Sequence, residues 1–159
     1  MAFEHPDLMP QMVARRAFES GSETALKHVD GSVLSWEEAY QDSLRFASAL
    51  ERLGVKRGQP VVTVFANSFD GFRVWQGCAW SGAIEAPINT TYKGDWLRHV
   101  VNNTGAEVVL TESRFAPPLF DIADQLEHVK SVVVFGDLDV TPASLPFQLV
   151  SVDEFLGDA

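Results

Sequence analysis

The sequence predicts an α/β protein with a mostly parallel sheet, helices on both faces of the sheet, and a short antiparallel hairpin before it. Between Gly58 and Ser113, strand-like runs alternate with helix-like segments, and a turn signal stands at nearly every junction. The run from Val61 to Ala66 is apolar and rich in β-branched residues, which is typical of a strand buried on both faces. Asp30-Gly31 lies between two shorter runs and is a two-residue hairpin signal.

The chain of 159 residues is long enough for one domain, and we expect one. Its parts are an entry segment at 1–24, an α/β core at 25–136 and an irregular tail at 137–159. The entry segment predicts a short helix from Met9 to Phe18, ended by Gly21. The main apolar residues of this helix are Met12, Val13 and Phe18. Strands at 25–29 and 33–34 would form the hairpin.

The best-defined helix begins at Ser35, because Ser35 and Glu38 form an S-x-x-E capping box. Gly54 supplies the left-handed residue that ends this helix. Residues at spacings of three, four or seven give one apolar stripe, made by Ala39, Phe46, Leu50 and Leu53.

The later elements follow from the same periodicity. Strands are expected at 61–66, 83–88, 108–110 and 132–135, the second of them also in the core of the sheet. Helices are expected at 69–81, 95–103 and 119–127. The apolar side of the helix at 95–103 is Trp96, Leu97, Val100 and Val101. After Gly136 the pattern weakens to a short strand at 148–150 and one helical turn at 152–156.

Composition excludes several classes of function. Asp and Glu number 22 against 12 Lys and Arg, a formal net charge of -10, which disfavours nucleic acid and anionic membranes as partners. The single cysteine, Cys78, permits no internal disulfide. We expect no membrane span and a cytoplasmic protein, because no long apolar run and no signal-like amino terminus is present.

Polar residues follow the expected parallel strands, and ligands of such sheets sit beyond the carboxyl ends of the strands. The candidates for a substrate cleft are Asn67, Asn89 and Thr90. Each has a simpler alternative: Asn67 or Ser68 caps the next helix, and residues 89–91 form an ordinary polar loop.

No catalytic, cofactor-binding or metal-binding residue is expected in this chain. The histidines, at positions 5, 28, 99 and 128, show no metal-ligand spacing. Cys78 is interpreted as a buried small apolar residue. The aromatic residues are expected in the core or in an interface with polypeptide absent from the chain; they are Phe65, Phe69, Phe72, Trp75 and Trp80.

The order of these features resembles the opening part of the adenylate-forming (AMP-binding) superfamily, most closely its acyl-CoA ligases. Three family patterns occur in order. L-[ST]-[YW]-x-E-L is matched by Leu34 to Ala39, L-x-x-x-G-V-x-x-G-D by Leu50 to Gln59, and G-A-x-x-x-P-x-N by Gly82 to Asn89. Ala39 and Gln59 depart from the family residues. Ile88 to Gly94 is most similar to ligases of the carnitine/crotonobetaine-CoA type.

The resemblance implies an enzyme that uses ATP and magnesium to form an acyl-adenylate and then transfers the acyl group to coenzyme A. The family's Ser/Thr/Gly-rich phosphate loop and its catalytic lysine match no residue here, so we expect none of these cofactors to bind this segment. The implied partner is the remainder of the adenylation domain, and we expect the segment alone to be inactive and to self-associate. Two alternatives stay open: a free-standing α/β binding module, and another adenylating enzyme such as a peptide-synthetase adenylation domain or a luciferase-like protein.

Overall fold

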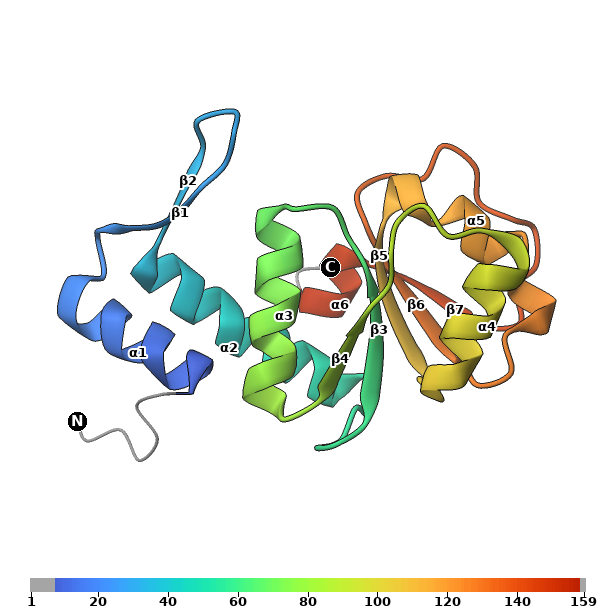
Figure 1. Cartoon of the computed structure of the whole chain (residues 1–159), viewed down its shortest axis with the longest axis horizontal. Helices are drawn as coiled ribbons and strands as arrows, with labels where there is room; N and C mark the ends of the chain where they lie inside the picture. The colour runs from blue at the N-terminus through green and yellow to red at the C-terminus, as the bar shows by residue number, and fades with distance from the viewer. Residues whose placement is uncertain (1–7, 158–159) are drawn as a thin grey trace.

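A five-stranded sheet forms the centre of the computed structural model, which describes residues 8–157 (Figure 1). The strand order is β4-β3-β5-β6-β7, and every neighbouring pair is parallel. The strands are β3 (Pro60–Val64), β4 (Ile84–Pro87), β5 (Val108–Glu112), β6 (Ser131–Phe135) and β7 (Gln148–Ser151). The structure confirms the predicted α/β class and the parallel sheet.

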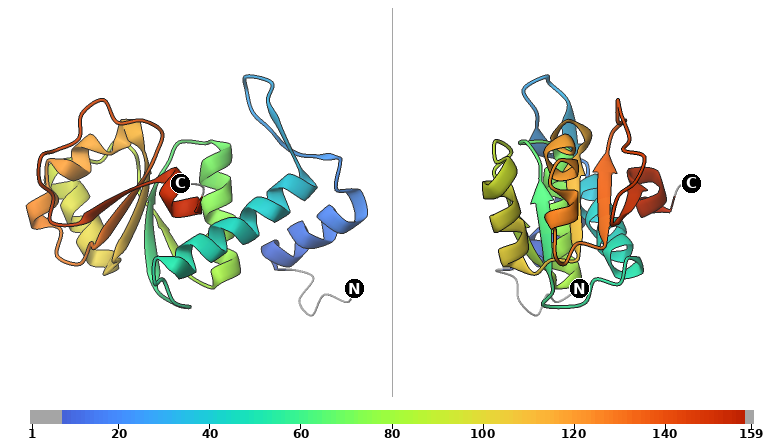
Figure 2. Two further views of the ribbon diagram at one scale, coloured as in Figure 1. Left: turned by 180° about the vertical axis from the view of Figure 1, so that it is seen from behind. Right: turned by 90° about the vertical axis from the view of Figure 1, so that its right-hand side faces the viewer.

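Helices cover both faces of this sheet (Figure 2). One face packs against α2 (Trp36–Arg52), α3 (Phe69–Ser81) and α6 (Val152–Leu156). The other face packs against α4 (Gly94–Thr104) and α5 (Pro117–Phe120). Neighbouring residues of a strand enter opposite cores, as Val61 and Val62 do. Two core layers therefore hold the sheet, in line with the apolar runs in the sequence.

A hairpin and one helix stand beyond the sheet edge, next to α3 (Figure 1). The hairpin pairs β1 (Thr24–Lys27) with β2 (Val33–Ser35) antiparallel, and α1 (Met9–Ser20) packs against α2. The hairpin loop is longer than the two residues expected. The backbone N–H of His28 donates to Ser32 O at 2.9 Å, so the loop consists of the residues between them, including Gly31. Gly31 has φ +93, a left-handed value that favours glycine at this turn.

Local sequence signals place most helix ends. The capping box of Ser35 and Glu38 is present at the start of α2, and α3 occupies the expected residues 69–81. Gly54 follows the end of α2 with φ +86. Two aromatic residues that were expected on the apolar sides of their helices are instead exposed. Phe18 is 75% exposed and Trp96 is 73% exposed. The stripe of α1 that packs inward is Val13, Ala14 and Ala17.

The expected helix at 119–127 is wrong. It breaks into the four-residue α5 and a separate 3-10 turn, η2 (Ala123–Gln125). The Asn102 side chain of α4 donates to Gln125 O at 2.9 Å and accepts from the backbone N–H of Glu127 at 3.1 Å. These bonds hold the backbone in a turn, so the chain can enter β6.

One further expectation about the strands is corrected. The strand expected as a second core strand is β4, which is the edge of the sheet, and Ile84 is 58% exposed there. Within the tail, the short strand expected at 148–150 and the helical turn expected at 152–156 are confirmed as β7 and α6. Val150 and Phe155 from this segment are buried in the core, so sheet pairing and apolar burial order it.

Candidate functional site

The candidate site is a groove where the hairpin loop, the first half of α3 and the carboxyl end of β3 meet. Its volume is ≈ 580 Å³, within the range of about 300–1,000 Å³ that small-molecule sites occupy. Aromatic side chains of α3 form one wall, and the side chains of β3 and β4 form the polar floor. The groove combines an apolar wall with few polar groups, which is the usual make-up of a binding site.

The aromatic wall follows from helical periodicity. Phe69, Phe72 and Trp75 are spaced by three along α3 and line the groove. The rings of Phe72 and Trp75 are 5.8 Å apart and T-shaped, and the ring of His28 is 6.0 Å from that of Phe69. Of the aromatic residues singled out in the sequence, most line the groove and one does not. Phe65 lines the groove and also packs against Phe135 at 5.0 Å, whereas Trp80 packs beside Tyr40 at 5.9 Å and is not part of the lining.

The floor contains a half-buried acid. Thr63 Oγ1 of β3 donates to Oε1 of Glu85 in β4 at 2.8 Å. Burial raises the pKa of Glu85 above its usual value, although the Thr63 bond acts in the opposite direction. Sequence reasoning missed Glu85. The available signal was a single acidic residue inside the apolar run at 83–88.

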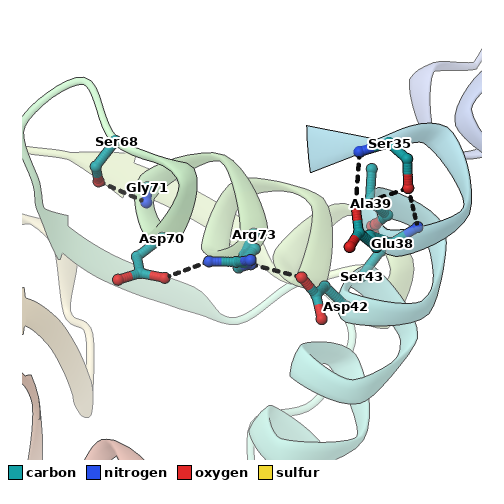
Figure 3. A network of polar contacts seen from close by, with 9 residues as sticks. All are labelled: Ser35, Glu38, Ala39, Asp42, Ser43, Ser68, Asp70, Gly71 and Arg73. Atoms are coloured by element: carbon teal, nitrogen blue, oxygen red, sulfur yellow. Dashed lines mark hydrogen bonds and ion pairs between the residues drawn. The ribbon is translucent and has the colours of Figure 1, made fainter. Parts of the chain in front are cut away.

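Ser68 serves as the cap that the simpler alternative predicted. Its Oγ accepts from the backbone N–H of Gly71 at 3.1 Å at the start of α3 (Figure 3). Glu112, at the end of β5, accepts from the backbone N–H of Ala66 at 2.9 Å and from Ser68 Oγ at 3.3 Å. Glu112 therefore fastens the end of β3 to the end of β5, while Asn67 lies on the groove.

The structure does not bring the three cleft candidates together. Asn67 lines the groove, whereas Asn89 and Thr90 do not. Asn89 Oδ1 instead accepts from the backbone N–H and the hydroxyl of Thr91, at 2.9 and 2.8 Å. That arrangement is an Asx turn, the ordinary use of Asn in a polar loop. A substrate contact by any of the three stays a prediction.

The described residues offer little for nucleophilic or phosphate chemistry. Cys78 is buried, and burial raises the pKa of its thiol to about 12, so it is no ready nucleophile. Arg114, which follows β5, is held by Glu112 at 2.6 Å. The phosphates of ATP need cations and N–H donors, and the absence of a nucleotide site from this segment stays a prediction.

Metal binding requires side chains that are grouped as ligands. Among residues 8–157, no three His, Cys, Asp or Glu side chains are grouped as metal ligands. His28 Nδ1 lies 3.2 Å from Asp30 Oδ2, and His99 is exposed on α4, while His5 lies outside the described residues. Within that same part of the chain, no helix is both long and apolar enough to cross a membrane.

Comparison with known proteins gives one family match. The family described as AMP-binding enzyme matches residues 13–154. The fatty acid–[acyl-carrier-protein] ligase ScoC of Streptomyces coeruleorubidus is 27% identical over 115 residues, which are 71% of this chain and 22% of ScoC. The uncharacterized protein Rv1549 of Mycobacterium tuberculosis is 26% identical over 130 residues, which are 81% of this chain and 74% of Rv1549.

A solved structure shares the fold. The anthranilate CoA ligase AuaEII, in complex with anthranoyl-AMP, superposes with a TM-score of 0.82 at 21% identity. The match covers 94% of this chain and 27% of that ligase. The chain thus spans about a quarter of the ligase and about a fifth of ScoC, but about three quarters of Rv1549.

Proposed function

This chain belongs to the AMP-binding enzyme family, and on that premise we propose that it forms the opening part of the large domain of an ATP-dependent acyl-CoA ligase. The observation that carries the proposal is the family match over residues 13–154. The fold shared with a CoA ligase over 94% of the chain supports it.

In the proposed enzyme, a carboxylic acid reacts with ATP, in the presence of magnesium, to give an acyl-adenylate and pyrophosphate. The thiol of coenzyme A then displaces AMP. The residues described here supply a scaffold for these steps: the parallel sheet, its capped helices and the groove beside α3. The rest of the adenylation domain is the proposed partner, and the cytoplasm the proposed location. Nucleic acid is not a proposed partner, given the net charge of -10.

Two alternatives have specific support. The match to Rv1549 covers 74% of that protein, which favours a free-standing α/β module without catalysis. The name of ScoC indicates a carrier protein as acyl acceptor in that enzyme, so a second adenylating reaction with this acceptor is also considered.

Calorimetric titration of the 159-residue chain with ATP and magnesium tests the proposal directly. We expect no detectable binding, because the family's Ser/Thr/Gly-rich phosphate loop matches no residue of this chain. Micromolar binding would show that the nucleotide site is already present in this segment. Pyrophosphate release by a longer natural protein that contains this sequence, measured across a panel of carboxylic acids, then identifies the acid. Activity with amino acids alone would contradict the acyl-CoA ligase proposal.

A further inference from the structure

We propose that the groove beside α3 binds an organic molecule that carries a protonated amine on an aromatic or aliphatic body, with the amine placed at Glu85. This proposal is independent of the ligase activity, because it depends only on the groove within this chain.

Glu85 lines the groove, so a ligand bound there lies beside its carboxylate. Thr63 donates to its Oε1 at 2.8 Å, and an ionised carboxylate can accept several further hydrogen bonds. Thr63 is itself buried and fixes the orientation of the acid. Burial raises the pKa of Glu85 and so disfavours its charged form. An ammonium group would reverse this effect, because it supplies both an opposite charge and N–H donors.

The wall of the groove suits the same ligand. Phe72 and Trp75 line it from α3, and aromatic faces attract cations as well as apolar groups. Trp75 is 38% exposed, so part of its ring is available for a ligand to cover. Phe69 extends the apolar surface toward the hairpin. An aromatic or aliphatic body can therefore bury its surface while its amine reaches the floor.

Other charged groups near the groove lie at its rim. Lys27 is exposed on the hairpin, and His28 is paired with Asp30 at 3.2 Å. Lys27 could instead attract a carboxylate ligand, but it faces solvent, where charge interactions are screened. Glu85 lies in the partly buried floor, where an ion pair is stronger. The position of Glu85 therefore favours an amine over an acid.

Calorimetry with three small probes of similar shape tests the proposal: phenethylammonium, phenethyl alcohol and hydrocinnamate. We expect phenethylammonium to bind at least about tenfold more tightly than the other two, the usual effect of a charged hydrogen bond. Glu85→Gln should remove this preference, because the amide keeps an acceptor for Thr63 but loses the charge. Glu107→Gln is the matched control. Glu107 is a half-exposed acid paired with Lys130 at 2.6 Å, outside the groove, so its replacement should leave all three affinities unchanged.

Three results would overturn the proposal. Equal affinities for phenethyl alcohol and phenethylammonium would show that the positive charge of the ligand does not contribute to binding. Tighter binding of hydrocinnamate would make the groove a site for acids, with Lys27 as the charged group nearest to it. Failure of all three probes to bind at millimolar concentration would show that the groove is no ligand site, and sedimentation would then reveal whether a second copy covers Trp75. Circular dichroism of Glu85→Gln confirms that its fold is unchanged.

Discussion

Gly77 in α3 lies so close to Phe46 in α2 that a Cβ atom at position 77 would stand 2.6 Å from Cβ of Phe46. Carbon atoms in contact normally keep about 3.5–4.0 Å apart. Helices α2 and α3 can therefore pack this closely only because position 77 has no side chain. The contact also fixes α3 over the sheet and so places the aromatic wall of the groove.

The first prediction is that Gly77→Ala destabilises the protein by about 1–3 kcal/mol, the usual cost of overpacking. Helix propensity alone would favour alanine by about 1 kcal/mol, so a loss of stability isolates the contact with Phe46. Urea unfolding measures the change. Ala79→Gly, at an exposed position of the same helix, is the control and should cost only about 1 kcal/mol. A Gly77→Ala variant as stable as the parent would refute the close approach.

A second prediction concerns Arg73, which joins α2 to α3 (Figure 3). Its Nε donates to Asp42 Oδ2 at 2.6 Å, and its Nη1 donates to Asp70 Oδ1 at 2.9 Å. These side chains are partly shielded, so we expect Arg73→Met to cost about 1–2 kcal/mol, between exposed and buried ion pairs. Arg98→Met should cost under about 0.5 kcal/mol, because its partner Asp95 is 89% exposed. Equal losses for the two variants, measured by urea unfolding, would contradict this assignment.

A third prediction concerns the capping box of α2. Ser35→Ala should cost about 1 kcal/mol in unfolding free energy, because the backbone N–H of Glu38 loses its acceptor. Ser48→Ala, on the exposed side of the same helix, should stay within about 0.5 kcal/mol of the parent.

The same capping box also makes stability depend on pH. Bonds from the backbone and side chain of Ser35 lower the pKa of Glu38 below its usual 4.5. The stabilisation from ionised Glu38 is therefore present above pH 4.5 and is lost as pH falls through the lower folded-state pKa. Glu38→Gln should differ from the parent at neutral pH, and the difference should disappear in acid.

Glu85 gives a pH dependence of the opposite sign, which is the fourth prediction. Its folded-state pKa is raised above the usual 4.5, so ionised Glu85 lowers stability at neutral pH, and protonation below pH 4.5 removes the penalty. We expect Glu85→Gln to raise the free energy of unfolding at neutral pH by on the order of 0.5 kcal/mol. Denaturant unfolding at several pH values should show this gain shrinking as pH falls toward 4.5. A gain that grows in acid would reverse the assigned direction of the shift.

Local signals in the sequence were sufficient for the capped helices and the central strands. Helix α3 lies at the expected residues because Ser68 caps it and Gly82 ends it with φ 75. The strand β7 was predicted only weakly, because Gln148 to Ser151 has little pattern of its own. Its pairing with β6, which places Val133 beside Val150, gives it order. The break after α5 depends on Asn102, which is distant in sequence.

The groove could not be predicted from the sequence, because it also depends on contacts between residues distant in sequence. Periodicity places Phe72 and Trp75 on one side of α3, but it does not show that the hairpin loop comes to the same place. Glu85 and Thr63 meet only because β3 and β4 pair in parallel with Val61 opposite Glu85. The cleft candidates follow from their place after strands, and that rule places Asn67 on the groove but does not point to an acid within a strand.

The fifth prediction is that the chain self-associates through side-chain contacts. Several large apolar residues are exposed, and the two most exposed aromatic side chains among the described residues are Phe18 and Trp96. The free edge of β4 is unsuited to further strand pairing. The backbone N–H groups of Ile84 and Ile88 already donate to Gln59 and Thr63, and Pro87, on the outward side between them, has no N–H. We therefore expect association to bury exposed side chains and not to add a strand at β4.

Sedimentation equilibrium over a range of concentrations measures this association. We expect it to strengthen with salt, because a net charge of -10 makes the copies repel each other and salt screens that repulsion. Replacing Phe18 and Trp96 together by serine should weaken it by at least about tenfold, since burying one aromatic side chain contributes about 1.5–3 kcal/mol. Val140→Ser is the control, because Val140 is equally exposed but is a small side chain in an irregular loop. A strict monomer at high protein concentration and high salt would contradict the prediction, since repulsion could then no longer mask an apolar interface.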